Sequence, residues 1–349
     1  DTKSSIETHS GLQVDLRILV PERWGTAIQY FGGSQAHNIH TRELALQQGY
    51  SLNEHALTPV SGGDPLLFDT EEALYAFLGL QWVPPEIRED WGEIEAAQAN
   101  QIPTLITIDD IRADLHMHTT WSDGKLSIRE MADAALKRGR EYICITDHSK
   151  NATIANGLSV ERLLAQQEEI RRVDAEMRPF RVFHGVELEI KADGDLDYPD
   201  EVLAQLDFVV ASLHVGLRQP REQVTARLLN AIRNPHVDLI GHPRGQLVNE
   251  RDPADLDMDA VFAAAQASGI ALEINANPHR LDLEASLARR AAELGIWIAI
   301  DTDAHSEADM DNLRYGILTA RRAWLTAAQV INTWTLATFE QWIAGRGKA

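Results

Sequence analysis

Asp114-Leu-His116-Met-His118, followed by Asp123-Gly124, is the stretch of sequence that decides the fold. It is a short apolar run that ends in two histidines. Six more apolar runs follow it along the chain, at residues 142–147, 182–190, 208–214, 237–241, 270–276 and 297–303. Together with residues 112–118, these runs predict seven strands, because they are short and rich in β-branched and aliphatic residues.

Helical patterns separate the predicted strands. Residues 128–138 carry apolar side chains every three or four positions, which is the spacing of one helix face. The same spacing recurs in residues 160–176, 222–233, 258–268 and 284–294. Gly139, Gly269 and Gly295 stand where glycine is favoured just after a helix. Seven β–α units with right-handed crossovers predict a parallel sheet that closes into a (β/α)₇ barrel, one unit short of the usual eight.

Histidine and carboxylate side chains stand at the ends of six of these seven strands. They are His116, His118, His148, Glu187, His214, His242, Asp303 and His305, and Asp123 follows the first pair. The C-terminal strand ends of such a barrel meet at one rim, so residues nearly 200 positions apart are expected in one pocket. Histidine and carboxylate are ligands of divalent metals, and the sequence therefore predicts a site for more than one metal ion.

Four other side chains near this rim have two interpretations each. Asp147 is either a carboxylate that stabilises the fold or an acceptor for the N–H group of a ligand imidazole. Arg244, Arg280 and Lys150 are candidate phosphate binders, because a cationic side chain pairs with phosphate oxygens, or they are ordinary surface charges. Arg280 follows the sixth strand, the only one that contributes no predicted metal ligand.

The composition sets limits on function. The length of 349 residues favours two domains, or a barrel with an appendage. A net charge of −21 argues against a chain that coats nucleic acid through bulk charge, so any DNA contact needs a local basic groove or bound metal ions.

The single cysteine, Cys144, lies in an apolar run, excludes an internal disulfide and fits a reducing compartment. No apolar stretch approaches the ~18 residues of a membrane span, and the start, which lacks a methionine or signal peptide, suggests a cut within a longer protein.

The motifs resemble those of the PHP (polymerase and histidinol phosphatase) domain family over residues 108–345. They are Leu115-His-Met-His118, Thr146-Asp-His148, Gly185-Val-Glu187, Ser212-Leu-His214, Gly241-His-Pro243 and Asp303-Ala-His305. The resemblance implies a distorted, TIM-like (β/α)₇ barrel with three divalent ions, Mn²⁺ or Zn²⁺. It assigns His116, His118, Glu187 and Asp303 to the first ion, Glu187, His214 and His242 to the second, and Asp123, His148 and His305 to the third.

The N-terminal region resembles the end of the palm and the thumb of a family X DNA polymerase. The matching segments are Val14-Asp15-Leu-Arg17, Ile28-Gln-Tyr30-Phe31-Gly-Gly-Ser34 and Leu52-Asn53-Glu54. The acidic segment 86–95 and the loop 100–103 suggest a linker. The resemblance implies a palm remnant (1–20), an α+β thumb (21–95), a linker (96–108) and the PHP domain (109–349). Asp15 matches one carboxylate of the polymerase site, whereas Gly32 and His55-Ala56 depart from the family pattern.

The resemblance implies metal-dependent hydrolysis of DNA, with a metal-bound water as the nucleophile. The expected activity is a 3′–5′ exonuclease, with cleavage at abasic sites as a possible addition, on single-stranded or gapped DNA. The expected setting is the cytoplasm of a bacterium, near the nucleoid, in a repair polymerase whose polymerase core is incomplete here. Two alternatives stay open: a small-molecule phosphatase of the histidinol-phosphatase type, and a non-catalytic domain that metal ions only make rigid.

Overall fold

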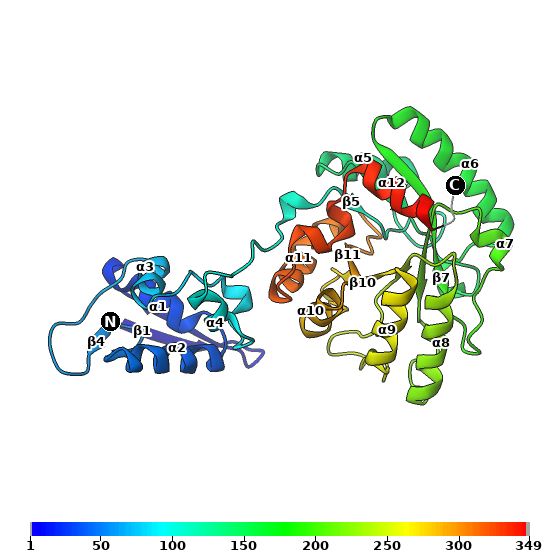
Figure 1. Cartoon of the computed structure of the whole chain (residues 1–349). Helices are drawn as coiled ribbons and strands as arrows, with labels where there is room; N and C mark the ends of the chain where they lie inside the picture. Colours follow the sequence, from blue (N-terminus) through cyan, green and yellow to red (C-terminus); the bar gives the residue numbers. More distant parts are fainter. Residues whose placement is uncertain (1, 347–349) are drawn as a thin grey trace. The chain divides into compact units, whose positions relative to one another are not determined.

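The computed structural model describes residues 2–346 and divides into two compact units, Asp1–Thr104 and Leu105–Ala349 (Figure 1). Residue 1 and residues 347–349, which are the outer ends of the predicted palm remnant and PHP domain, lie outside the described residues. None of the helices in residues 2–346 combines the length and hydrophobicity that a membrane crossing needs.

The first unit is small and mixes helices with short hairpins. Strands β1 (Thr2–Glu7) and β2 (Gln13–Ile18) form an antiparallel pair. The helices are α1 (Trp24–Phe31), α2 (Gln35–Gln47), α3 (Glu71–Phe77) and α4 (Glu93–Gln98), and a second hairpin joins β3 (Tyr50–Leu52) to β4 (Leu57–Pro59). Helix α2 begins at Gln35 because the hydroxyl of Ser34 accepts a hydrogen bond from the His37 N–H group at 3.1 Å.

The acidic segment 86–95 is part of this unit and not an exposed linker. Glu93 is fully buried, and its carboxylate accepts a hydrogen bond from His37 Nδ1 at 2.6 Å. The backbone N–H groups of Asp90 and Trp91 donate to the same carboxylate. An acidic side chain is stable in a core when hydrogen bonds replace its hydration, which composition alone does not reveal. The predicted linker 96–108 therefore overlaps the end of helix α4.

The second unit contains the seven predicted strands in one parallel sheet, in sequential order. They are β5 (Ala113–Asp114), β6 (Tyr142–Ile145), β7 (Arg181–Glu189), β8 (Phe208–Ser212), β9 (Leu239–Ile240), β10 (Ala271–Asn275) and β11 (Trp297–Asp301). Most strands end earlier than the sequence predicts, so most of the predicted metal ligands stand in the loops that follow them.

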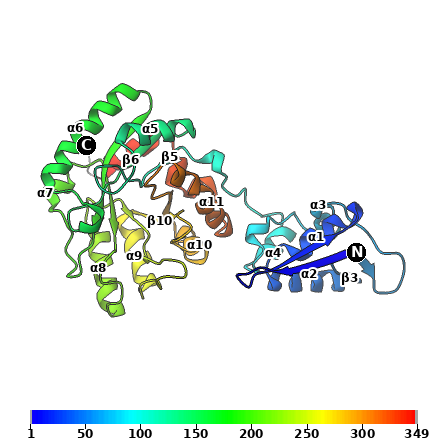
Figure 2. The ribbon, with the colours of Figure 1, turned by 180° about the vertical axis from the view of Figure 1, so that it is seen from behind.

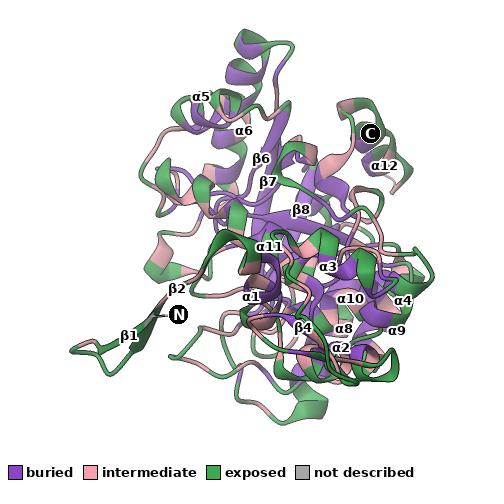
Figure 3. Cartoon of the chain, turned by 90° about the vertical axis from the view of Figure 1, so that its left-hand side faces the viewer, coloured by how far each residue is buried: buried purple, intermediate pink, exposed green. Residues whose placement is uncertain are grey.

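Helices cover the outside of this sheet, as two opposite views show (Figure 1 and Figure 2). They are α5 (Ile128–Lys137), α6 (Val160–Met177), α7 (Asp200–Leu203), α8 (Arg221–Arg233), α9 (Met258–Ser268), α10 (Ala285–Glu293), α11 (Leu313–Arg322) and α12 (Leu336–Gly345). The strands are buried except at Arg181 and Trp297, the first residues of β7 and β11, and the helices turn their buried faces toward them (Figure 3). Gly139, Gly269 and Gly295 have positive φ angles of 77°, 64° and 77°, which is the helix-ending conformation that the sequence predicts.

The sheet closes between its first and last strands, which makes it a nearly complete barrel. The backbone N–H of His118 donates to the Ala304 carbonyl at 2.9 Å, and the Leu115 N–H donates to Asp301 Oδ1 at 2.7 Å. Asn332 adds a side-chain link across the same seam, since its amide donates to Asp301 Oδ1 at 2.7 Å and its oxygen accepts from the Ile300 N–H at 2.7 Å. The predicted (β/α)₇ barrel is confirmed. Closure brings the loop after β5 beside the loop after β11.

Candidate metal centre

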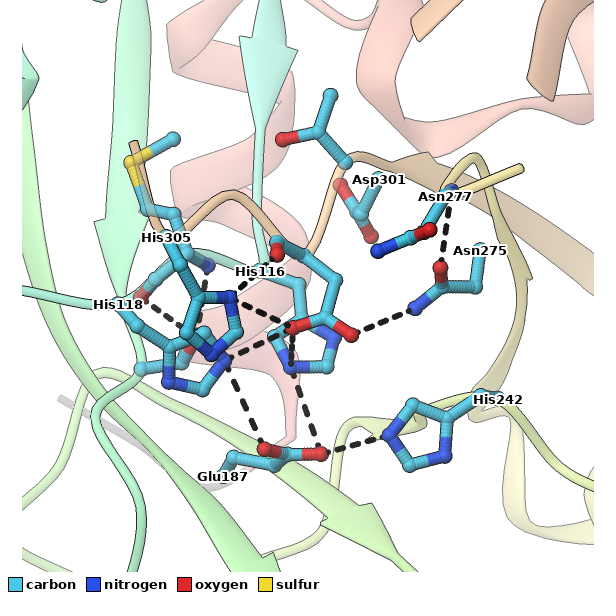
Figure 4. A network of polar contacts seen from close by, with 12 residues as sticks. His116, His118, Glu187, His242, Asn275, Asn277, Asp301 and His305 are labelled. Atoms are coloured by element: carbon cyan, nitrogen blue, oxygen red, sulfur yellow. Dashed lines mark hydrogen bonds and ion pairs between the residues drawn. The ribbon is translucent and has the colours of Figure 1, made fainter. Parts of the chain in front are cut away.

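The nine predicted ligands gather on one rim of the barrel. His116 and His118 follow β5, His148 follows β6, and His214 and His242 each stand two residues beyond β8 and β9. Asp303 and His305 follow β11, whereas Glu187 lies within β7. Figure 4 shows His116, His118 and His242 directed at the Glu187 carboxylate. Asp303 and His242 have positive φ angles of 53° and 26°, so the loops bend sharply at two of these positions.

Glu187 occupies the centre of the group. Its Oε1 atom lies 3.5 Å from His116 Nε2, 3.2 Å from His214 Nε2 and 2.9 Å from His242 Nε2. Its Oε2 atom lies 3.6 Å from His118 Nε2 and 2.8 Å from His148 Nδ1. One buried carboxylate therefore faces five imidazole rings, which is the position of a ligand that bridges neighbouring ions.

The ligand atoms form three groups, each compact enough to hold one ion. They are His116 with His118 and Asp303; His148 with Glu187 and His214; and His118 with Asp123, His148 and His305. The first group contains three of the four residues that the resemblance assigns to the first ion and lacks Glu187. The third group contains all three assigned residues, with His118 in addition. In the second group His148 stands where His242 was expected, and His242 instead makes a hydrogen bond to Glu187 through Nε2 at 2.9 Å.

The buried imidazoles fit a metal site, because several of their nitrogens have no hydrogen-bond partner. These atoms are His116 Nε2, both ring nitrogens of His118, His148 Nδ1 and His242 Nδ1. A buried polar atom without a partner costs about 1–3 kcal/mol, and nitrogens that face a shared carboxylate are well placed to offer their lone pairs to a cation. The ligand set contains histidine and carboxylate only, which suits divalent metal ions. Cys144 is buried in β6, outside the group.

The charges in the pocket also favour cations. Burial alone would raise the pKa of Glu187 and of Asp303, but the neighbouring imidazoles hold both values well below the usual range. Burial and the nearby His305 lower the pKa of His118 to about 3, so its ring is neutral at physiological pH. Burial opposes the charge on His214, yet Glu187 raises its pKa to about 10. Without metal ions, the proton on His214 balances part of the negative charge of the carboxylates. Divalent ions bound here would supply that positive charge instead.

Two carboxylates that were not predicted from the sequence accept hydrogen bonds from the ligand histidines. Glu273, on β10, accepts a hydrogen bond from His116 Nδ1 at 2.7 Å and is fully buried. Glu189, at the end of β7, accepts from His214 Nδ1 at 2.6 Å. An ionisable residue inside an apolar strand is the signal that would have pointed to both.

Asp147 does not have the role of imidazole acceptor that was one of its two predicted roles. Its carboxylate accepts hydrogen bonds from the Thr119 N–H and hydroxyl at 2.8 and 2.6 Å, and from Gln166 at 2.5 Å. Ser122 also donates to it. Because Asp147 precedes His148, its side chain points to the opposite side of the backbone. It holds the turn between His118 and Asp123, which agrees with the fold-stabilising alternative.

The three candidate phosphate binders have different surroundings. Arg280 lines a cavity of about 450 Å³ together with Glu187, His214, Asp303 and others of the nine residues. Its Nε lies 3.4 Å from Asp303 Oδ2, and Nη1 has no hydrogen-bond partner. Arg244 pairs with Glu284, and Lys150 lines a different hollow beside Lys191 and Asp195. Of the three, only Arg280 is placed to reach a ligand in this cavity.

Asp15 belongs to the first unit, whereas the metal centre belongs to the second. It stands on β2, opposite Ser5 of β1, and pairs with Lys3 at 2.9 Å. The hydrogen bond from Ser5 is the largest of the contacts that lower its pKa. The apolar side chains around it are exposed, with Leu16 and Ile18 both 62% accessible.

Family models and individual relatives match both units. The DNA polymerase beta thumb model matches residues 27–89, and the PHP domain model matches residues 114–277. A DNA polymerase/3′-5′ exonuclease PolX of Bacillus subtilis (strain 168) is 41% identical over 345 residues, or 98% of this chain and 60% of the relative. A probable phosphatase of Thermoanaerobacter sp. (strain X514) is 33% identical over 232 residues, or 63% of this chain and 89% of the relative. A solved histidinol phosphate phosphatase of Lactococcus lactis, complexed with zinc, L-histidinol and phosphate, is 21% identical, with a TM-score of 0.45 over 60% of this chain and 93% of that one.

The barrel and its rim of histidines and carboxylates define a PHP domain. A polymerase thumb precedes this domain. The similarity to PolX covers 98% of this chain and so includes both domains. The chain belongs to the bacterial family X DNA polymerases, of which it carries the thumb and PHP parts. It spans 60% of the length of the Bacillus subtilis relative.

Proposed function

We propose that this chain hydrolyses phosphodiester bonds of DNA from the 3′ end, at a centre of three divalent ions, Mn²⁺ or Zn²⁺. The observation that carries the proposal is the position of Glu187, whose two oxygens lie within 3.6 Å of nitrogens from five histidines. The nine predicted ligands would share the ions: His116, His118, Asp123, His148, Glu187, His214, His242, Asp303 and His305.

The bound ions would supply Lewis acidity and lower the pKa of a water molecule to near neutrality. The side chains of the protein hold and orient the substrate. Arg280 lines the cavity with an unpaired Nη1 and would donate to the non-bridging phosphate oxygens. Ile154 and Val215 line the same cavity as exposed apolar side chains, which suits the sugar and base of a terminal nucleotide. Abasic-site cleavage is a further activity that such a centre would support.

The thumb favours DNA over a small phosphate ester. A phosphatase of small molecules has no need of a polymerase thumb, and the relative that aligns with 98% of this chain is named as a 3′-5′ exonuclease. We include residues 1–20 in this proposal as part of a palm, with Asp15 as one of its carboxylates. Primer extension by this chain is expected to fail, because one carboxylate does not hold the two ions that nucleotide transfer requires.

The small-molecule phosphatase is the second candidate function. It is favoured by the 33% identity, over 63% of this chain, to a probable phosphatase. The proposal also includes a setting in the bacterial cytoplasm, in DNA repair near the nucleoid. It is supported by the relationship to PolX and by the single buried cysteine.

The test uses single-stranded and gapped DNA with a fluorescent label on the 5′ end. In Mn²⁺ or Zn²⁺ we expect a ladder of products that shorten one nucleotide at a time, and a chelator is expected to abolish it. His116→Ala removes a proposed ligand and should lower the rate more than about 100-fold. Loss of a residue that only hydrogen-bonds to a metal ligand already lowers metal affinity or activity by about 10- to 100-fold. Intact DNA together with phosphate release from histidinol phosphate would favour the phosphatase instead.

A further inference from the structure

We propose that Glu273 is a positioning residue that orients two metal ligands, His116 and His242, at the same time. The inference rests on the proposed metal centre, but it concerns how the protein holds its ligands and not which substrate is cut. Glu273 comes from β10, the strand that contributes none of the nine predicted ligands.

The contacts of Glu273 reach both sides of the centre. Its Oε1 accepts a hydrogen bond from His116 Nδ1 at 2.7 Å, and its Oε2 accepts from the backbone N–H of His242 at 2.5 Å. Asn275, two residues further along β10, donates to the same Oε2 at 3.2 Å. Glu273 is fully buried and is not among the described residues that line the cavity, so it acts through the histidines and not on a substrate.

The hydrogen bond to His116 selects one tautomer of the ring. A neutral imidazole carries one N–H group, and the acceptor at Nδ1 holds the proton there. The lone pair is then on Nε2, which has no hydrogen-bond partner and lies 3.5 Å from Glu187 and 3.7 Å from Asp303. Without the carboxylate the ring would be free to carry its proton on Nε2, which is the wrong nitrogen for an ion.

The hydrogen bond to His242 supports an unfavourable backbone conformation. His242 has a φ angle of 26°, which a residue with a side chain adopts only when its surroundings hold it there. The charged acceptor on β10 fixes the N–H group at this bend, and with it the direction of the ring toward Glu187. One carboxylate thus sets the tautomer of one ligand and the backbone of another.

The same arrangement occurs once more in the site, at Glu189 and His214. Glu189 accepts from His214 Nδ1 at 2.6 Å, and Nε2 of that ring points to Glu187 at 3.2 Å. Glu189, however, lines the cavity and can also meet a substrate. Glu273 therefore gives the cleaner test, because its replacement leaves the cavity wall unchanged.

The experiment compares Glu273→Gln with Asp174→Asn in the full chain. Asp174 is a buried carboxylate on α6 that accepts from the Val182 N–H at 2.9 Å and lies outside the metal centre. Binding of Mn²⁺ is measured by calorimetry, and binding of Co²⁺ is followed by its visible absorption bands. We expect Glu273→Gln to weaken the binding of at least one ion by about 10- to 100-fold and to shift the Co²⁺ bands. Asp174→Asn should match the wild-type chain within about twofold in ion affinity, because it touches none of the ligands.

Unchanged affinity and an unchanged Co²⁺ spectrum in Glu273→Gln would overturn the inference. If that variant does not fold, Glu273→Asp provides the test, because it keeps the charge but shortens the side chain, and weaker ion binding is again expected. Neither measurement involves DNA. A wild-type chain that binds ions but leaves DNA intact would refute the proposed nuclease and leave the role of Glu273 standing, whereas tight binding in both variants would refute only the role of Glu273.

Discussion

Replacing Asn332 by alanine is expected to loosen the seam that closes the barrel. The Asn332 side chain is fully buried between the first and last strands of the sheet. Its oxygen accepts from the Ile300 N–H at 2.7 Å, and its amide donates to Asp301 Oδ1 at 2.7 Å and to the Ala113 carbonyl at 3.3 Å. Alanine cannot replace any of these three bonds. The two strands that it joins lead into the loops that carry His116 and Asp303.

The expected cost follows from the groups that lose a partner. The buried Ile300 N–H is left unsatisfied, which costs about 1–3 kcal/mol, and the other two hydrogen bonds are worth about 0.5–1.5 kcal/mol each. The free energy of unfolding of the second unit should therefore fall by about 2–6 kcal/mol. For a unit of this size, 4 kcal/mol corresponds to a drop of roughly 8–16 °C in melting temperature.

Calorimetry in the presence of chelator measures this change without a contribution from bound ions. Asn230→Ala is the matched control, because Asn230 is an exposed residue of α8 that donates to the Gly194 carbonyl at 2.8 Å. Its replacement should change the stability by less than about 1 kcal/mol. An Asn332→Ala melting temperature that equals that of the control would refute the argument, since the seam would then hold without this side chain.

Three other predictions concern the metal centre directly. Chelation should lower the melting temperature of the second unit, because an ion that binds only the folded state at 100 times its Kd adds about 2.7 kcal/mol; equal melting curves with Mn²⁺ and with chelator would argue against bound ions. Gly241→Ala should cost about 1–3 kcal/mol of unfolding free energy, since an added Cβ would lie 2.6 Å from Ser212 Oγ and 3.3 Å from the His116 ring; denaturant titration measures it, and a neutral result would contradict the packing seen here. Asp303→Asn should abolish nuclease activity while His40→Ala, at an exposed pair with Asp90, retains it; equal loss in both variants would indicate a general folding defect.

The sequence predicted the barrel because its pattern repeats. Each apolar run is followed by a segment with helical spacing, and glycines such as Gly139 mark where helices end. The lengths of the strands were less well predicted. Residues 112–118 suggested one strand, but only Ala113–Asp114 pairs regularly with β6. The residues that follow leave the regular ladder to bond with the loop after β11, a long-range pairing that no local pattern records.

The side chains that support the centre were harder to predict than its ligands. His116 and His118 stand out because two histidines at i and i+2 of a strand share a face. Glu273 and Glu189 carry a weaker signal, an acidic residue inside an apolar strand, which does not say what the residue contacts. Their partners are far away in sequence or on a neighbouring strand. Lys150 and Arg244 were sound candidates by sequence position, yet Arg244 pairs with Glu284 and Lys150 lines a different hollow.

The sequence by itself determined which chemical groups the rim carries and that a parallel sheet would bring them to one end. This follows because strand periodicity and the order of β–α units are local properties of the chain. The tertiary structure alone decided which histidine faces which carboxylate, that Glu187 stands at the centre, and that Asp147 supports a turn. These depend on the bends at His242 and Asp303 and on contacts between residues as distant as His116 and Glu273, which exist only once the barrel has closed.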